Sequence, residues 1–248
     1  MIDELANSLL PGVPVERVAA ALGAAAGQEL ASGKFGSPES SSALAVNGFG
    51  PFLESADTLP PFPCLHDLDW PALSVDIERQ MRFPWAGGRH PWLDAAIETA
   101  THLIGVESKR FEPFRDFKLA KLSPKYSTHH WDEGMEPWCA MRDRLHAEPA
   151  AFRHLDAAQL VKHGYGLVAE AKRWGKTPVL LYLFAEPTEG RAMPAKAFAD
   201  HRSEIAGFAA GVAGSTVHFA SCSWREWLTT FPPSLTDHAD RLIARFHP

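Results

Sequence analysis

Apolar and polar residues alternate along the chain in patterns that predict both strands and helices. The segment "ALSVDIERQ", residues 72–80, alternates with a period of two, which is typical of a half-buried strand. The segment "TPVLLYLFAEP", residues 177–187, is almost continuously apolar, as expected of a central strand covered on both faces. Between them, residues 155–175 are predicted to form a helix that ends at Gly175. These elements favour an α/β fold.

The segments before and after these elements are predicted to be mainly helical. An alanine-rich stretch with Pro14 in its first turn predicts a helix over residues 14–31, and a second helix is expected from Ser37 to the residue before Gly50. Five prolines between residues 51 and 72 predict an irregular linker. Further helices are expected over residues 136–145, 197–214, 224–231 and 235–246, and a strand over 215–224. With the hairpin described next, the order is helix, three strands, helix, strand, helix, strand, which indicates one α/β domain with helical additions.

Two of the three consecutive strands come from one hairpin, "PWLDAAIETATHLIGVESKR", at residues 91–110. With its turn centred on Ala100 and Thr101, Asp94 faces Glu107 across the two strands. One face is then apolar and is expected to meet the core; it carries Leu93, Ala95, Ile97, Ile104 and Val106. The other face carries Asp94, Ala96, Gly105, Glu107 and Lys109.

Two acids and a lysine therefore share one side of the hairpin. Directly opposed carboxylates repel, which would raise the pKa of one of them unless a cation lies between them. A divalent ion that prefers hard oxygen ligands would satisfy both acids, which suits Mg²⁺, with Mn²⁺ as the alternative. Lys109 would then orient or deprotonate a water, or stabilise the charge that develops on a phosphoryl group. Gly105 keeps this face open and Ala96 is small, which favours a site there. A different register, or a solvent face whose charges are merely hydrated, is the alternative.

The sequence "PWLD", followed after residues 95–106 by "ESK", resembles the motif of the PD-(D/E)XK, or restriction-endonuclease-like, nuclease superfamily. Pro91 and Asp94 supply the first part in a spread form, which departs from the adjacent "PD" pattern, and Glu107 to Lys109 supply the second. The resemblance implies an αβββαβ core over residues 37–248, with a mixed central sheet flanked by helices and extra N- and C-terminal helices. Residues 1–36 would be a helical extension.

The same resemblance implies that the protein is a metal-dependent nuclease that hydrolyses phosphodiester bonds, in DNA in preference to RNA. Asp94 and Glu107 would hold Mg²⁺, Lys109 would assist the attacking water, and Gln159 would support the site from the helix after the third strand. A nuclease-like fold that binds nucleic acid or a partner without turnover, and a metal-dependent hydrolase of another substrate, remain alternatives.

Several further residues are candidates for supporting roles. Gln159, Lys162 and His163 are spaced to share one helix face, although a solvated face would have the same pattern. Glu39 is either an additional acid of the site or a first-turn acid that interacts with the helix dipole. Glu98 lies four residues along the strand from Asp94 and is expected to be outside the site.

A basic segment follows the hairpin and is the candidate nucleic-acid contact. Residues 109–126, "KRFEPFRDFKLAKLSPKY", carry six basic and two acidic residues with interleaved aromatic residues, in a chain whose net charge is −6. Lys118, Lys121 and Lys125, together with Lys162 on the helix, would contact phosphates. A solvated charged loop is the alternative.

The composition bounds the remaining possibilities. At 46% hydrophobic residues the chain can bury a core, and no apolar run is long enough to span a bilayer, so no membrane partner is expected. The N-terminal segment has no signal-peptide pattern, and the three widely spaced cysteines suit reduced thiols in the cytoplasm. The histidines lack zinc spacing, and no Walker, dinucleotide or nucleophile-elbow motif occurs.

Overall fold

Five strands form one mixed sheet whose strands follow the order of the chain, β1-β2-β3-β4-β5. The computed structural model describes residues 2–25, 33–87, 89–115, 117–190 and 193–248. The first three strands are antiparallel neighbours, and β4 runs parallel to both β3 and β5. The predicted α/β fold with a mixed sheet flanked by helices is therefore confirmed. No helix among the described residues is long and apolar enough to cross a membrane.

The strands are β1 (Ser74–Gln80), β2 (Trp92–Glu98), β3 (His102–Lys109), β4 (Thr177–Phe184) and β5 (His218–Ser223). The helices before and after the hairpin are α1 (Ile2–Asn7), α2 (Val15–Ala24), α3 (Ser41–Phe49), α4 (Glu112–Arg115), α5 (Lys125–Thr128) and α6 (Glu136–Ala147). The later helices are α7 (Ala157–Trp174), α8 (Ala195–Gly211), α9 (Trp224–Leu228) and α10 (Thr236–Phe246).

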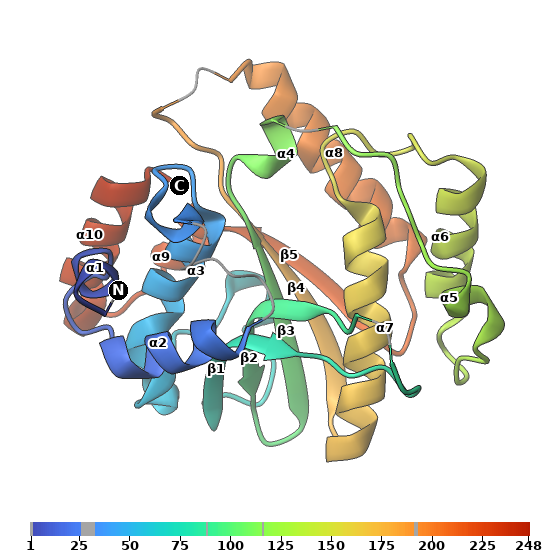
Figure 1. Ribbon diagram of the computed structural model, residues 1–248, viewed down its shortest axis with the longest axis horizontal. Helices are drawn as coiled ribbons and strands as arrows, with labels where there is room; N and C mark the ends of the chain where they lie inside the picture. The colour runs from blue at the N-terminus through green and yellow to red at the C-terminus, as the bar shows by residue number, and fades with distance from the viewer. Residues whose placement is uncertain (1, 26–32, 88, 116, 191–192) are drawn as a thin grey trace.

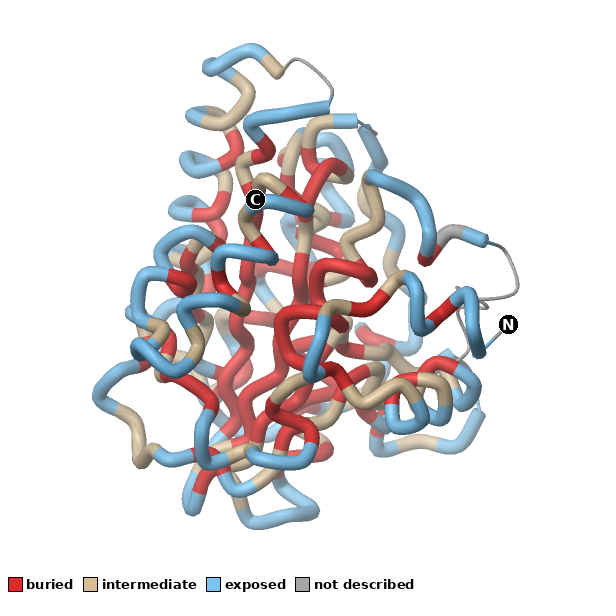
Figure 2. Tube along the Cα trace, turned by 90° about the vertical axis from the view of Figure 1, so that its left-hand side faces the viewer, coloured by how far each residue is buried: buried red, intermediate tan, exposed pale blue. Residues whose placement is uncertain are grey.

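Helices cover both faces of the sheet, so the molecule has three layers (Figure 1). One face packs against α2, α3 and α9, with α1 on the outside of α2 and α10 on the outside of α3. The aromatic residues Phe49, Trp224 and Trp227 fill that core. The other face packs against α7, with α6 and α8 beside it. Figure 2 shows the buried residues as a continuous band through the middle of the molecule, with exposed residues around it. Burial on both sides explains why β4 is apolar along its whole length.

Three expectations about local structure require correction. The helix expected over residues 14–31 begins at Val15 and ends at Ala24, and residues 26–32 lie outside the described part of the chain. The helix expected from Ser37 begins at Ser41, because the Ser40 hydroxyl accepts a hydrogen bond from the Ala43 backbone and caps it.

The proline-rich segment after α3 is not a free linker. It forms short 3-10 turns at Gly50–Leu53, Ala56–Thr58 and Pro63–Leu65, and its apolar side chains Phe52, Phe62 and Leu65 are fully buried in the core that α3 and α9 share. Proline fixes the backbone of such a segment without regular hydrogen bonding, so irregular structure does not imply exposure.

Arg110 joins three distant parts of the chain directly after β3. Its buried guanidinium donates hydrogen bonds to the carbonyl oxygens of Pro38 and Phe246, and it lies over the Phe246 ring. Burial lowers the pKa of this guanidinium below its usual range. Arg110 is one of the six basic residues of the segment 109–126, but its guanidinium is buried and anchors the end of β3.

We expect Arg110→Met to lower the free energy of unfolding by about 2–4 kcal/mol, because it removes the donor from the buried Phe246 carbonyl and from the partly buried Pro38 carbonyl. Arg115→Met is the matched control: Arg115 pairs with Glu39 at the surface, where an ion pair contributes about 0–1 kcal/mol. Urea denaturation of the two variants measures the difference. Equal stability of both variants would contradict an anchoring role for Arg110.

Candidate active site

The hairpin that carries the acids has the predicted register. Ala95 pairs with Val106, Ala96 with Gly105, and Ile97 with Ile104 in the antiparallel ladder of β2 and β3. The backbone pairing of the two strands ends at Ala95 and Val106. Beyond it, the Ser108 backbone N–H donates a hydrogen bond of 2.6 Å to the side-chain oxygen Oδ2 of Asp94. Asp94 is therefore held against the strand that carries Glu107 and Lys109.

The alternation of β1 and β2 reverses at the level of Asp94, which the sequence pattern did not predict. Val75 and Ile77 face the α3 side of the sheet, but Met81 belongs to the core on the α7 side, although all three positions are odd-numbered. Leu93 likewise belongs to the α7 side while Ala95 and Ile97 face α3, so its predicted place on a common face with them is wrong.

Glu78 lies at this reversal with φ of 49°, in the left-handed region that non-glycine residues rarely adopt. It occupies the position in β1 between residues that pair with Ala95 and Leu93, and thus stands beside Asp94. Its carboxyl is one of the groups that raise the pKa of Asp94. The twisted backbone at Glu78 therefore brings a third acid toward the pair, and strained backbone of this kind is concentrated at functional sites.

Glu107 is almost completely buried and has a different partner on each carboxylate oxygen. Lys109 Nζ lies 2.5 Å from Oε1, and His163 Nε2 on α7 lies 2.9 Å from Oε2. Burial by itself would raise the pKa of Glu107, but the charge of Lys109 and the imidazole of His163 outweigh it and hold that pKa at about 2. Glu107 is thus an anion.

The pKa of Asp94 shifts in the opposite direction from that of Glu107. Burial, the charge of Glu107 and the carboxyl of Glu78 raise its pKa well above the usual range, and Lys109 only partly offsets them. The pKa of Lys109 is itself raised, because the carboxylates of Glu107, Glu112 and Asp94 outweigh its burial. The site therefore holds one anion, one cation and one carboxyl that is driven toward its neutral form, so its acids outnumber its one cation.

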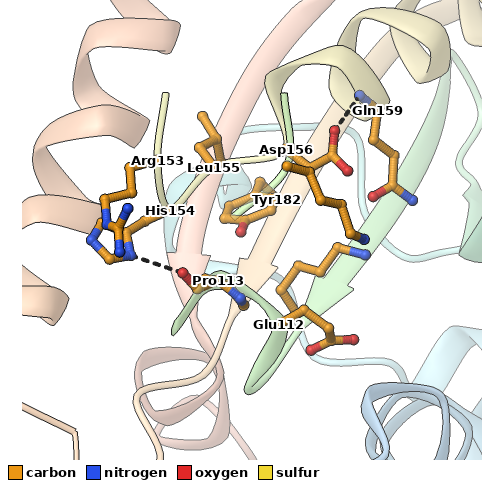
Figure 3. A pocket seen from close by; sticks show the side chains of 10 residues that line it. Glu112, Pro113, Arg153, His154, Leu155, Asp156, Gln159 and Tyr182 are labelled. Carbon is orange, nitrogen blue, oxygen red and sulfur yellow. Dashed lines mark hydrogen bonds between the residues drawn. The ribbon is translucent and has the colours of Figure 1, made fainter. Parts of the chain in front are cut away.

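A pocket opens on the far side of Lys109. It is lined by Lys109 and Tyr182 from the sheet, Glu112 and Pro113 from α4, and residues of the loop and first turn of α7 that include Asp156 and Gln159. Figure 3 shows Asp156 and Gln159 at the start of α7, with Tyr182 and the segment of Glu112 and Pro113 across from them. Asp94 and Glu107 do not line this pocket, so Lys109 separates the acids from it.

Backbone contacts fix the walls of the pocket. The carboxylate of Glu204 on α8 accepts hydrogen bonds from the backbone N–H groups of Arg153, His154 and Leu155, and Asp156 caps α7 by accepting from the Gln159 backbone. The Tyr182 hydroxyl lies 3.0 Å from His201 Nε2. Because burial lowers the pKa of His201 to about 3, this imidazole is neutral and shares a hydrogen bond with the hydroxyl.

Gly105 has a different role from the one expected. It does not leave the face open, because a Cβ atom at this position would come within 2.4 Å of Leu93 Cδ1 and 3.2 Å of Leu167 Cδ1. The absence of a side chain allows α7 to lie close against β3, and this close approach brings His163 to Glu107. The glycine thus sets the distance between the helix and the strand of the site.

The other candidate residues are distributed as follows. Gln159 lines the pocket beside Lys109, whereas Lys162 faces a neighbouring groove and His163 is buried against Glu107, so the three do not form one exposed face. Glu39 pairs with Arg115 at 3.1 Å, and Glu98 pairs with Arg79 at 2.7 Å, away from Asp94.

Three contributors were not predicted. The sequence does not indicate Glu78, because its strained backbone interrupts a strand whose pattern is regular. Glu112 follows Lys109 by three residues in α4, and Tyr182 approaches Lys109 through the pairing of β3 with β4.

The order of the elements and the position of the acids define the αβββαβ class of restriction-endonuclease-like proteins, with α3, β1 to β3, α7 and β4 as its core. A family model described as "Restriction Endonuclease associating with ARP", REase-ARP, matches residues 5–247. The chain belongs to this restriction endonuclease family. Comparisons with curated proteins and with solved structures gave no significant match. Within the described part of the chain, no group of three or more His, Cys, Asp or Glu side chains is arranged to hold a metal ion.

We expect Gly105→Ala to lower the free energy of unfolding by about 1–3 kcal/mol, since the added methyl group must displace Leu93 or α7. Gly207→Ala on α8 is the matched control, because a Cβ there has nothing within 4 Å, and alanine favours the helix by about 1 kcal/mol. Thermal unfolding of the two variants should shift in opposite directions. A neutral Gly105→Ala would show that helix and strand are not in close contact.

Proposed function

We propose that the protein is a metal-dependent nuclease that hydrolyses phosphodiester bonds, in DNA in preference to RNA. The single observation that carries the proposal is the cluster of Asp94, Glu107 and Lys109 where the β2–β3 ladder ends, with Glu107 buried, the other two partly buried, and a pocket beside them that has Gln159 on its wall. Membership of a restriction endonuclease family supports the same conclusion.

The acids fit a divalent cation by charge and by donor type. Asp94 and Glu107 present carboxylate oxygens, which Mg²⁺ prefers, and Mn²⁺ accepts the same ligands. Burial, together with the charges of Glu107 and Glu78, raises the pKa of Asp94, and a cation between the acids would favour the charged form of both. When bound, such an ion stabilises the charge that develops on the phosphoryl group and promotes ionisation of the attacking water.

Lys109 and Gln159 are proposed to act on the substrate. Lys109 is the only one of the three clustered residues that lines the pocket, so its ammonium group would donate to a phosphoryl oxygen or to the attacking water. Gln159 would donate or accept on the opposite side and fix the position of the same group. His163 would hold Glu107 from behind, because it occupies the oxygen that Lys109 does not contact.

Phosphate contacts are proposed for Lys118, Lys121, Lys125 and Lys162. The first three are exposed, and all four line the pocket of Lys109 or the hollows that adjoin it. A row of cations beside the acids would offset the repulsion between a polyanion and an acidic site.

The first test is cleavage of plasmid, linear and single-stranded DNA, and of RNA, by the purified chain with Mg²⁺ or Mn²⁺. Asp94→Ala, Glu107→Ala and Lys109→Ala should each reduce the rate by about a hundredfold or more, because each removes charge from one cooperating unit. Double variants should lose little beyond the single ones. Full activity of Glu107→Ala would refute the proposal, and binding without cleavage by the wild type would favour a binding module.

The second test measures the metal site without relying on cleavage. An ion at a hundredfold its Kd should stabilise the wild type by about 2.7 kcal/mol, which corresponds to a rise in Tm of about 5–10 °C for a chain of this size. Asp94→Asn should abolish this rise. It should also match or exceed the wild-type Tm in EDTA, because the amide removes repulsion from Glu107 and Glu78. Calcium, tested in parallel, separates binding from turnover, and an unchanged metal response in Asp94→Asn would exclude Asp94 as a ligand.

The third test concerns the phosphate contacts. Replacing Lys118, Lys121 and Lys125 together with glutamine should weaken DNA binding and reduce the slope of log K against log salt by about one unit per lost contact. The control replaces Lys172 and Lys196, which pair with Asp132 and Asp200 elsewhere on the surface. If the salt dependence of DNA binding has the same slope in the triple variant and in the control variant, the three lysines face solvent only.

A further inference from the structure

A continuous groove leads away from the pocket of Lys109. That pocket shares Lys118 and Asp156 with a second hollow, and the second hollow shares Lys121 and Lys162 with a third. The third hollow adds Lys125 and Arg89 to its lining and ends at the aromatic side chains Phe83, Trp85 and Tyr126. We call this surface, from Lys109 to Trp85, the basic groove.

The lysines of the basic groove differ from other lysines in their partners. Among the described residues, no carboxylate lies within ion-pair distance of Lys118, Lys121, Lys125 or Lys162. Elsewhere Lys172 and Lys196 pair with aspartates, and Lys176 donates to the carbonyls of Thr99 and Ala100. Two acids line the groove: Asp156 caps α7, and Glu112 accepts hydrogen bonds from the Ser41 hydroxyl and the Arg110 backbone. Within the described part of the chain, the four lysines therefore present positive charge without an ion-pair partner.

Trp85 stands at the far end of the groove as a braced aromatic surface. Its ring is stacked on Phe83, with centroids 4.7 Å apart and planes 17° apart, and it contacts the rings of Tyr126, His129 and Trp131 at centroid distances of 5.2–6.0 Å. It remains partly exposed and lines the hollow with Arg89 and Lys125. The surrounding rings fix its orientation, so little conformational freedom would be lost when a flat ligand stacks on it.

We propose that Trp85 is a stacking subsite for an unpaired nucleobase, and that the substrate has single-stranded nucleotides beside the bond that is cleaved. This inference rests on the proposed nuclease function. Inside a duplex both faces of a base are covered by its neighbours, so an interior base must leave the stack before it can stack on a side chain. The lysines between Trp85 and Lys109 would follow the phosphates that connect the stacked base to the pocket.

The combination of charge and aromatic surface is what recognition of single strands requires. Phosphate contacts alone would accept a duplex equally well, whereas a braced ring at the end of a line of cations favours a flexible strand that can present a base. The predicted substrate is therefore a single strand, a flap or a junction with unpaired bases, and a fully paired blunt duplex should bind by charge alone.

The test measures equilibrium binding of the full chain to fluorescently labelled DNA in EDTA, so that cleavage plays no part. The probes are a mixed-sequence single strand and a blunt duplex of the same length. Trp85→Leu keeps apolar bulk against Phe83 but removes the aromatic face. It should weaken single-strand binding by about 5- to 150-fold and leave duplex binding unchanged. Trp85→Phe should restore most of the single-strand affinity.

Trp174→Leu provides the matched control, because Trp174 is an exposed tryptophan at the end of α7, outside the linings of the groove's hollows. It should leave both affinities unchanged. The salt dependence of single-strand binding should be the same in Trp85→Leu and in the wild type, since no charge is lost.

An equal loss on both probes, or no loss on either, would overturn the subsite. Single-strand binding that depends on Trp85 would uphold it even in a chain without nuclease activity, so the two proposals fail separately.

Discussion

The hydrogen bond from the Ser108 backbone to Asp94 is the contact on which the site depends. It lies where the ladder of β2 and β3 opens, and it replaces backbone pairing with a bond between a strand and an acidic side chain. Because residue 108 stands between Glu107 and Lys109, the same bond fixes the distance of Asp94 from both. The opposite side of Ser108 is held as well, since its hydroxyl accepts from Trp224 Nε1 in the core beneath α9. The motif is therefore anchored from both faces of the sheet.

Burial gives this arrangement its electrostatic character. Carboxyl groups in water would repel each other only weakly, but exclusion of solvent strengthens each charge interaction and makes the balance among Glu107, Lys109 and Asp94 decisive. α7 supplies much of this exclusion, and it can approach because Gly105 has no side chain in its path. Packing at Gly105 therefore affects the electrostatics of the site, because this residue without a side chain controls how close His163 comes to Glu107.

The hairpin register, the buried central strand and the helix ending at Gly175 could be predicted from the sequence, because each has a local cause in periodicity or turn chemistry. The reversal at Glu78 could not, since nothing in "SVDIERQ" indicates a left-handed backbone at a glutamate. The basic segment, residues 109–126, also has a feature that the sequence alone could not predict. Arg110 and Lys118 look alike in sequence, yet one is buried among carbonyl groups and the other faces solvent, because tertiary packing decides which charge is neutralised.

The anchoring of Arg110 has a consequence for biosynthesis. Its guanidinium binds the carbonyl of Phe246, and it directly follows the lysine of the site, so β3 obtains its last fixed contact from a helix that is translated long after it. Until residue 246 emerges, Arg110 can bind the Pro38 carbonyl but lacks its contact with the last helix. Completion of the site is thereby tied to synthesis of the final helix, and a prematurely terminated chain would lack it.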